Sequence, residues 1–465
     1  MKRFLIFICL CFLLAICPTL GKTWSLDSLR VMAIRNNKSL RMAGEQQQSA
    51  SFSHKAARTN YLPKISAAGA YLYTSKEMSL LSDEQKSPLS KLGAGLNNVP
   101  LLSSLGDRLN AIGQGLVDAF HTDTRHAGVL AVTLTQPIYM GGKIRAYDNI
   151  TRYAAQIADH MYDKTLQDVI VEVDEAYWTL VALKSKKQLA EGYKQLVDRL
   201  ASDVDLMFRE GLARKADVLS VKVRSNEAQV ALIQVDNGLR LSEMNLCRIC
   251  GLPMDSSMDI NVEDVPLEMA FPQEQDMVEH AVGHRDELKA LELQTLIYGE
   301  KVRIARSEFL PQVALMGGYL ASNPSVFNSF ERQMKGMWNV GVTVSMPLIT
   351  WGERKYKVRA AKADARLHRY EAEEAREKIV LQVNQCRQRL YESKQRLETS
   401  GTNLEEAEEN LRYADVGLKE GVIPLSNVLE AQTAWLKARS EWVNAQVDVR
   451  LASLYLKKAL GNVSH

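Results

Sequence analysis

Two long segments of the chain carry the hydrophobic spacing of helices that pack along one another. In residues 352–421 an aliphatic residue recurs every seven positions: Val383, Leu390, Leu397, Leu404, Leu411 and Leu418. A seven-residue repeat is typical of helices that supercoil together. Residues 142–211 and 352–421 contain no proline. Each segment is therefore predicted to form one helix roughly 100 Å long, at about 1.5 Å per residue.

Both long helices are predicted to fold back as antiparallel hairpins. Gly211 and Gly421 stand where each helix is expected to end, and glycine most readily takes the left-handed conformation of a helix C-cap. Helical spacing of apolar residues resumes a few positions later in both segments. The predicted hairpins are residues 142–250 and 352–460.

Four shorter segments alternate apolar and polar residues instead. The alternation is clearest where four apolar side chains share one face: Trp338, Val340, Val342 and Val344. A period of two predicts strands of a sheet with one apolar face. The predicted strands are residues 64–75, 128–137, 311–321 and 338–347. About ten residues is also the length of a tilted membrane-spanning strand.

Four prolines are predicted to mark the boundaries of these strands. Pro63 and Pro311 come where a helix is expected to give way to a strand. Pro137 and Pro347 come where a strand is expected to give way to a helix. Proline has no N–H to donate and disfavours helical dihedrals in the residue before it, so it suits such boundaries.

The chain contains this order of elements twice. The segments VTLTQPIYMGG and VTVSMPLITWG place Pro137 and Pro347 210 positions apart (347 − 137), and the two helix-ending glycines have the same separation. The segments NYLPKISAAGAYL and EFLPQVALMGGYL place Pro63 and Pro311 248 positions apart (311 − 63). Offsets that hold over this much sequence indicate a duplication. The first copy has 38 more residues between its two prolines (248 − 210).

The duplication predicts the domain organisation. Residues 22–251 form the first repeat and residues 274–465 the second. An acidic, proline-bearing connector, residues 252–273, joins them. The additional residues of the first repeat fall in a polar outer loop, residues 76–126, between its two strands.

The N-terminus has the pattern of an export signal. A basic start precedes an apolar run, and Thr19 and Gly21 place small residues before a cleavage site. Residues 1–21 are therefore predicted to be a signal peptide. Cys17 allows an alternative in which this cysteine carries a lipid anchor.

Composition narrows the class of partner. After the signal, no apolar run approaches the ~18 residues of a membrane-spanning helix, so the exported chain is predicted to be soluble or to cross a membrane as a β-barrel. The whole chain carries a formal net charge of +3. Removing Lys2 and Arg3 with the signal leaves it nearly neutral, which argues against nucleic acid as a partner.

The sequence predicts no catalytic, metal or cofactor site. Cys247 and Cys250 form a CxxC that could be a redox or metal pair, but its place on an apolar helical stripe favours simple packing. His280 and His284 are one helical turn apart and could bind a metal. The glutamate that follows the first histidine in zinc proteases is missing, however, and a solvated helix face is the favoured interpretation. We therefore expect a protein that is not an enzyme.

Duplicated strand pairs and long hairpins behind an export signal resemble the TolC-like outer membrane efflux proteins, or outer membrane factors. The resemblance covers about residues 24–462. It rests on the YLP and FLP strand entries, the QP and MP strand exits, and the glycine-bounded reversals REGLARKADVL and KEGVIPLSNVL. It implies a mainly α fold with a transmembrane β-barrel. Each protomer of a homotrimer would give four strands to a twelve-stranded barrel in outer membrane lipid, and its duplicated hairpins would form an α-barrel in the periplasm.

The resemblance implies a passive exit duct of a tripartite efflux or type I secretion system. Its partners would be a periplasmic adaptor (membrane fusion) protein and an inner membrane pump. The candidate docking residues lie at the two hairpin tips: Arg209, Gly211, Lys419 and Gly421. The alternative is a periplasmic coiled-coil adaptor or scaffold without a membrane barrel. Such a protein would carry one long hairpin, whereas this chain has two.

The resemblance also indicates a pore gate at the tips. The acidic rings of the family match Asn427 and Glu430 in the second repeat, and Asp217 matches an acidic residue of the first. The basic partner that the family gives this first-repeat acid falls on Ile423, so that link is predicted to be absent. Acids at Asp217 and Glu430 also suit a helix N-terminus on dipole grounds, and both roles are compatible.

Overall fold

The computed structural model describes residues 24–75, 81–95, 103–119, 125–256, 258–260, 276–327 and 332–463. The predicted signal peptide, Cys17 and most of the predicted connector lie outside these residues. The chain divides into two compact units. The first contains residues 1–51, 153–295 and 367–465, and the second contains residues 52–152 and 296–366.

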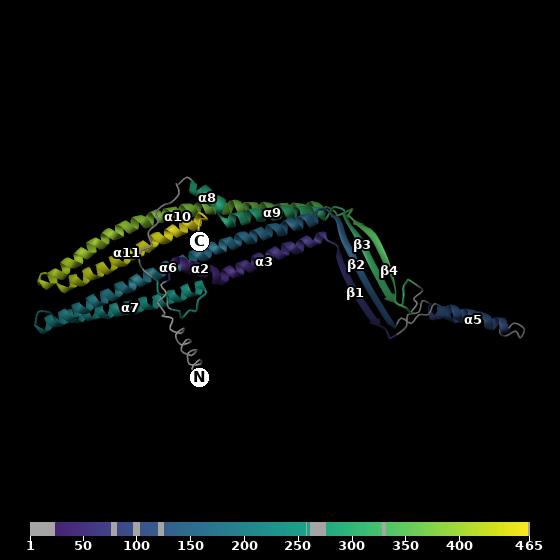
Figure 1. Ribbon diagram of the computed structural model, residues 1–465, viewed down its shortest axis with the longest axis horizontal. Coiled ribbons are helices and arrows are strands. Elements are labelled where there is room, and N and C mark those ends of the chain that lie inside the picture. The colour runs from purple at the N-terminus through teal and green to yellow at the C-terminus, as the bar shows by residue number, and fades with distance from the viewer. Residues whose placement is uncertain are drawn as a thin grey trace, which may run out of the picture. The chain divides into compact units, whose positions relative to one another are not determined.

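The second unit contains a four-stranded antiparallel sheet in the order β1-β2-β3-β4 (Figure 1). Its strands are β1 Lys64–Tyr73, β2 His126–Met140, β3 Gln312–Asn323 and β4 Lys335–Ser345. Each repeat contributes one adjacent pair, and the repeats join where β2 pairs with β3, for example Thr133 with Gly318. The four predicted strands are therefore present, in one continuous sheet.

This sheet is exposed in the single chain. All residues of β1 are exposed, and the large apolar side chains on one face of β4 are between 60% and 75% exposed: Trp338, Val340, Val342 and Val344. Among the described residues, β1 and β4 each pair with a strand on one side only. Unpaired strand edges and an exposed apolar face both favour association with further chains or lipid.

Three of the four prolines lie at the boundary of a strand, as predicted, and one does not. Pro63 and Pro311 directly precede β1 and β3, and Pro347 follows β4. Pro137, in contrast, lies inside β2, which runs to Met140, so the predicted strand end is wrong. The register shifts directly after Pro137. Such a bulge interrupts the ladder where proline has no N–H to donate, which lets the strand continue past it.

The connection between β1 and β2 contains two helices that the sequence did not predict, α4 Asp83–Ser90 and α5 Ser103–Ala119. The Gly93 N–H donates to Asn110 Oδ1 at 2.8 Å, and the backbone at Gly113 approaches Leu89 O so closely that a Cβ would not fit. Because glycine is a poor helix former, the glycines of α5 kept this helix from being predicted. In the structure these glycines allow the two helices to pack.

The first unit is helical, and several of its helices continue into the second unit. The helices of the two repeats are α2 Leu26–Asn36, α3 Lys38–Arg58, α6 Lys143–Arg209 and α7 Lys215–Cys250, then α8 Asp276–His284, α9 Asp286–Ser307, α10 Glu353–Lys419 and α11 Leu425–Ala459; a 3-10 turn, η1 Thr59–Tyr61, follows α3. Helices α6 and α10 have 67 residues each, and α7 and α11 return beside them (Figure 1). None of the described helices has an apolar stretch that would let it span a membrane.

The two repeats build their cores from equivalent positions. The first core contains Leu29, Leu40, Val173 and Ile249. The second contains Met277, Leu288, Val383 and Ala459. The first two residues of each set are 248 positions apart (277 − 29 and 288 − 40), and the last two are 210 apart (383 − 173 and 459 − 249). The offsets that the sequence predicts are therefore the offsets of the packing.

Each repeat also interrupts its first helix at an equivalent place. Asn37 separates α2 from α3, and Arg285 separates α8 from α9, 248 positions later (285 − 37). Asn37 Nδ2 donates to Ile249 O at 3.0 Å, and Arg285 Nη1 donates to Ala459 O at 3.1 Å. Both side chains thus satisfy a carbonyl at the end of a returning helix, where no partner is available within the helix itself.

Candidate functional site at the two hairpin tips

The two hairpin tips have the same backbone geometry. Gly211 has a φ of +79° and Gly421 a φ of +74°. The N–H groups of Leu212 and Val422 donate to carbonyls five positions earlier, at 2.8 and 2.9 Å. This is the Schellman motif, which needs a residue in the left-handed conformation at the turn and therefore favours glycine. The two predicted reversals therefore use the same backbone motif.

The charged docking candidates are also equivalent. Arg209 lies 2.8 Å from Asp205, and Lys419 lies 2.7 Å from Asp415, with both acids one helical turn earlier. The hydrogen bond to Asp415 raises the pKa of Lys419. Both cations are well exposed. Each tip therefore presents a cation whose charge a neighbouring carboxylate partly balances.

An apolar pair at the tips was missed by the sequence reasoning. Leu212 is 75% exposed and Val422 is 77% exposed, and they are 210 positions apart (422 − 212). A single exposed apolar residue is ordinary, but here the same position is apolar and exposed in both repeats. The duplication offset could have found the pair, because each residue directly follows a helix-ending glycine.

Asp217 caps the helix of its own tip. Its carboxylate accepts hydrogen bonds from the backbone N–H of Arg214 at 3.0 Å and from Arg214 Nε at 3.2 Å. The side-chain hydrogen bond from Arg214, and then the backbone one, lower the pKa of Asp217. The capping role that the sequence allowed is therefore present, and the basic partner is a residue of the same turn.

Ile423 takes a different place. Its side chain covers Gly417, where a Cβ would collide with it, and its N–H donates to Gly417 O at 3.1 Å. It packs against the apolar cluster that joins the two hairpins near their tips, which includes Val197, Val218 and Val428. Ile423 therefore contributes apolar packing. In the family that the sequence resembles, this position carries the basic partner of the first-repeat acid.

Asn427 and Glu430 lie on one exposed face of α11. They are three positions apart, so a helix brings them to the same side, and both are exposed while Val428 and Ala431 between and beside them are buried. Asp217 is on α7, in the other hairpin. The structure thus groups two of the three gate candidates and leaves the third as a cap.

The cysteine and histidine pairs have structural roles. Cys247 and Cys250 are buried free thiols in the first core. Burial raises the pKa of Cys250 to about 12, so the thiol stays protonated and unreactive. The rings of His280 and His284 stack 3.9 Å apart, and each Nδ1 lies within hydrogen-bond distance of a backbone carbonyl.

Comparison with known proteins agrees with this architecture. The sequence profile of the outer membrane efflux protein family matches residues 29–252 and 277–462. Outer membrane protein TolC of Vibrio cholerae serotype O1 is 22% identical over 223 residues, 48% of this chain and 51% of that protein. Protein CyaE of Bordetella pertussis is 23% identical over 276 residues, 58% of this chain and 57% of that protein. The aligned parts span only about half the length of these two relatives.

The fold is also similar to that of solved structures. The outer membrane protein VceC of Vibrio cholerae superposes with a TM-score of 0.73 at 16% identity, covering 94% of this chain and 96% of that one. The family profile matches both repeats and most of the chain. The chain belongs to the outer membrane efflux protein family, whose members are channels of the outer membrane and not enzymes.

Proposed function

We propose that this chain is the passive exit duct of a tripartite efflux or type I secretion system. Three copies would join their four-stranded sheets into one twelve-stranded barrel in the outer membrane. Their long hairpins would form a helical tunnel in the periplasm. The observation that carries the proposal is the sheet. Within the described part of the chain both of its edges are unpaired, it has an exposed apolar face, and a four-stranded sheet cannot close on itself.

The two tips would dock a periplasmic adaptor, which links the duct to an inner membrane pump. Leu212 and Val422 are exposed apolar anchors at equivalent positions, and Arg209 and Lys419 flank them. Apolar anchors within a polar rim are typical of protein interfaces. With two tips per protomer, a trimer would present six similar docking points.

Extraction and conductance test the proposal. The full chain, purified in detergent from outer membranes, should run as a trimer and form channels in planar bilayers. A protein that washes off membranes in carbonate as a monomer, without channel activity, would instead indicate the adaptor or scaffold alternative.

The gate assignment is tested in the same bilayers. Glu430 is exposed at the tip and is the acidic member of the pair Asn427 and Glu430 on α11. We expect Glu430→Gln to reduce cation selectivity and block by multivalent cations. Asp217→Asn should change cation selectivity and cation block much less, because the carboxylate of Asp217 already accepts hydrogen bonds from Arg214. Equal effects of the two substitutions would contradict the assignment.

Docking is tested by charge at the apolar anchors. We expect Leu212→Asp with Val422→Asp to abolish transport in cells and adaptor cross-linking, while the amount of trimer stays unchanged. Val223→Asp is a matched control, because Val223 is 56% exposed on α7 away from the tip. Full transport by the double variant would refute docking at these two residues.

A further inference from the structure

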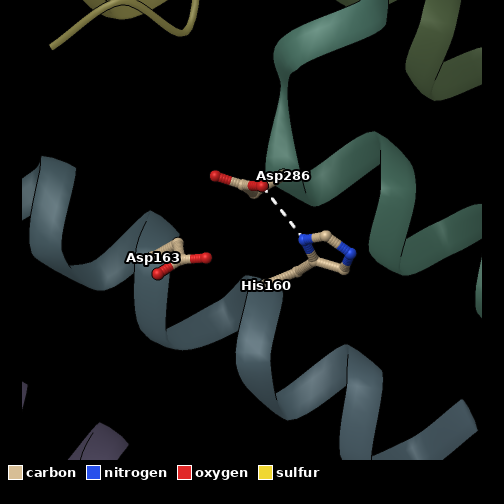
Figure 2. Close-up of side chains that lie close together, drawn as sticks. All are labelled: His160, Asp163 and Asp286. Carbon is tan, nitrogen blue, oxygen red and sulfur yellow. Dashed lines mark hydrogen bonds and ion pairs between the residues drawn. The ribbon is translucent and has the colours of Figure 1, made fainter.

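Three metal-ligating side chains meet in the helical unit, away from the tips. His160 and Asp163 lie on α6, three positions apart, and Asp286 begins α9 (Figure 2). One potential ligand atom from each residue lies within 4.8 Å of the other two. No motif joins them in the sequence, because His160 and Asp286 are 126 positions apart (286 − 160). The sequence therefore offers no spacing that would indicate this cluster, and none of the three residues was predicted to bind a metal.

We propose that His160, Asp163 and Asp286 form a binding site for a divalent transition-metal cation such as Zn²⁺. A nitrogen and two carboxylate oxygens make a ligand set that zinc and its neighbours accept. Two residues three apart on a helix face the same side, and the third comes from a second helix, so the ligands surround a point between the helices.

The geometry needs little change to close around an ion. Ligand atoms bound to one Zn²⁺ at about 2.0–2.2 Å are roughly 3.4 Å apart in tetrahedral geometry, against the present limit of 4.8 Å. His160 Nδ1 is already 3.0 Å from Asp286 Oδ1. Asp163 is exposed and points toward the other two side chains (Figure 2). A rotation of its side chain alone would supply the remaining approach.

The surroundings hold one ligand in place and leave another free. Gln167 Nε2 donates to Asp286 Oδ2 at 3.3 Å, which orients that carboxylate as an outer-shell group does in metal sites. Asp163 accepts no hydrogen bond from any described residue. A cation between the carboxylates of Asp163 and Asp286 would offset the repulsion between their negative charges.

The ion would replace the direct contact between His160 Nδ1 and Asp286 Oδ1. Metal ligation needs neutral imidazole, so Nδ1 would bind through its lone pair while Nε2 keeps its hydrogen. Lys289 Nζ, 3.7 Å from Asp286 Oδ1, is the competing cation. Its removal is therefore predicted to tighten metal binding.

Zinc titration of the whole, tag-free protein in detergent tests the site. We expect calorimetry to give one Zn²⁺ per protomer and X-ray absorption to give a nitrogen and oxygen shell at about 2.0–2.1 Å. His160→Ala and Asp163→Asn should each weaken binding by at least about tenfold. Lys289→Met should strengthen it.

Two controls share the chemistry without the cluster. Asp159→Asn changes the acid next to His160. The carboxylate of Asp159 accepts a hydrogen bond from Gln47 and is not part of the cluster. His54→Ala changes a histidine whose Nδ1 lies 3.6 Å from the carboxylate of Asp148 and 3.2 Å from the hydroxyl of Thr151. Both should bind Zn²⁺ as the unmodified protein does. Lack of stoichiometric Zn²⁺ uptake, or equal affinity of His160→Ala, Asp163→Asn and the controls, would overturn the proposal. Each variant is first checked for the trimer of the unmodified chain.

Discussion

The two repeats share their apolar contacts and several polar ones, but a buried ion pair of the first repeat has no counterpart in the second. In the first repeat, Arg30 of α2 donates to Asp174 of α6, with Nε to Oδ1 at 2.7 Å and Nη2 to Oδ2 at 2.5 Å. The equivalent residues of the second repeat are Val278 (30 + 248) and Asn384 (174 + 210). Val278 packs against the second core, and Asn384 bonds to a carbonyl of its own helix.

The difference indicates which contacts a duplicated fold can vary. An apolar position can exchange leucine for methionine, as at Leu29 and Met277, because volume and burial are kept. A buried ion pair depends on both partners. It is therefore found whole in one repeat and replaced at both positions in the other.

Removing Arg30 from its ion pair with Asp174 should have the largest effect on stability. Asp174 is 3% exposed at its side chain, so Arg30→Met leaves a buried carboxylate without its partner, at a cost of about 3–5 kcal/mol. Burial already raises the pKa of Asp174, and the hydrogen bond from Arg30 opposes the rise. Helix unfolding, followed by circular dichroism in detergent, gives the free-energy change.

The second repeat supplies the control for this change. The double variant Arg30→Val with Asp174→Asn copies its residues, and we expect it to recover most of the lost stability. If the double variant is as unstable as Arg30→Met, the two positions are not equivalent in packing. Val278→Ala, by comparison, should cost only the lost apolar contact.

The glycines that end the returning helices should differ between the repeats. Gly251 and Gly461 both have positive φ, +69° and +74°, and each lies against the residue before a helix break. A Cβ at Gly251 would lie 2.7 Å from Asn36 Cβ, whereas a Cβ at Gly461 would lie 3.3 Å from His284. Left-handed strain costs about 1–2 kcal/mol in either case, and overpacking adds about 1–3 kcal/mol at Gly251 alone.

We therefore expect Gly251→Ala to lower the free energy of unfolding by about 3 kcal/mol and Gly461→Ala by about half as much. Denaturant unfolding of the two variants side by side measures the difference. Gly211→Ala is the reference for strain without contact, since nothing lies within 4 Å of a Cβ there. Equal losses at Gly251 and Gly461 would mean that Asn36 can move aside.

The sequence predicts regular features well because they repeat. Heptad spacing, the alternation of apolar and polar residues and two constant offsets were enough to place both hairpins and four strands, apart from the end of β2. Irregular features were missed. Pro137 lies within a strand because of a bulge, and α5 contains glycines that usually oppose helices.

Contacts between distant segments were the least predictable. No local pattern brings Asp286 to His160, and no charge pattern pairs Arg30 with Asp174 across 144 positions. Partners within one turn are different. A capping arrangement needs only a spacing of three residues, so the bond between Arg214 and Asp217 could have been read from the sequence.

The smallest predicted effect concerns the caps at the two tips. Asp217 and Asn427 are equivalent (427 − 217 = 210), yet only Asp217 accepts a hydrogen bond from the N-cap backbone, because the N-cap of α11 is Pro424, which has no N–H. Asp217→Asn should cost about 0.5–1 kcal/mol near neutral pH through lost charge at the helix N-terminus. Asn427→Asp should gain less than that, because proline offers the new carboxylate no donor.

The pH dependence separates these contributions. The pKa of Asp217 is lowered in the folded protein, so its stabilisation is complete above the pKa of the unfolded chain, about 3.9. It declines as the pH falls below that value and is lost below the folded pKa. The stability difference between the unmodified protein and Asp217→Asn should therefore be constant from pH 6 to 8 and shrink below about pH 4. A difference that persists in acid would show that Asp217 stabilises its tip by shape and not by charge, and the two repeats would then differ at this position in geometry alone.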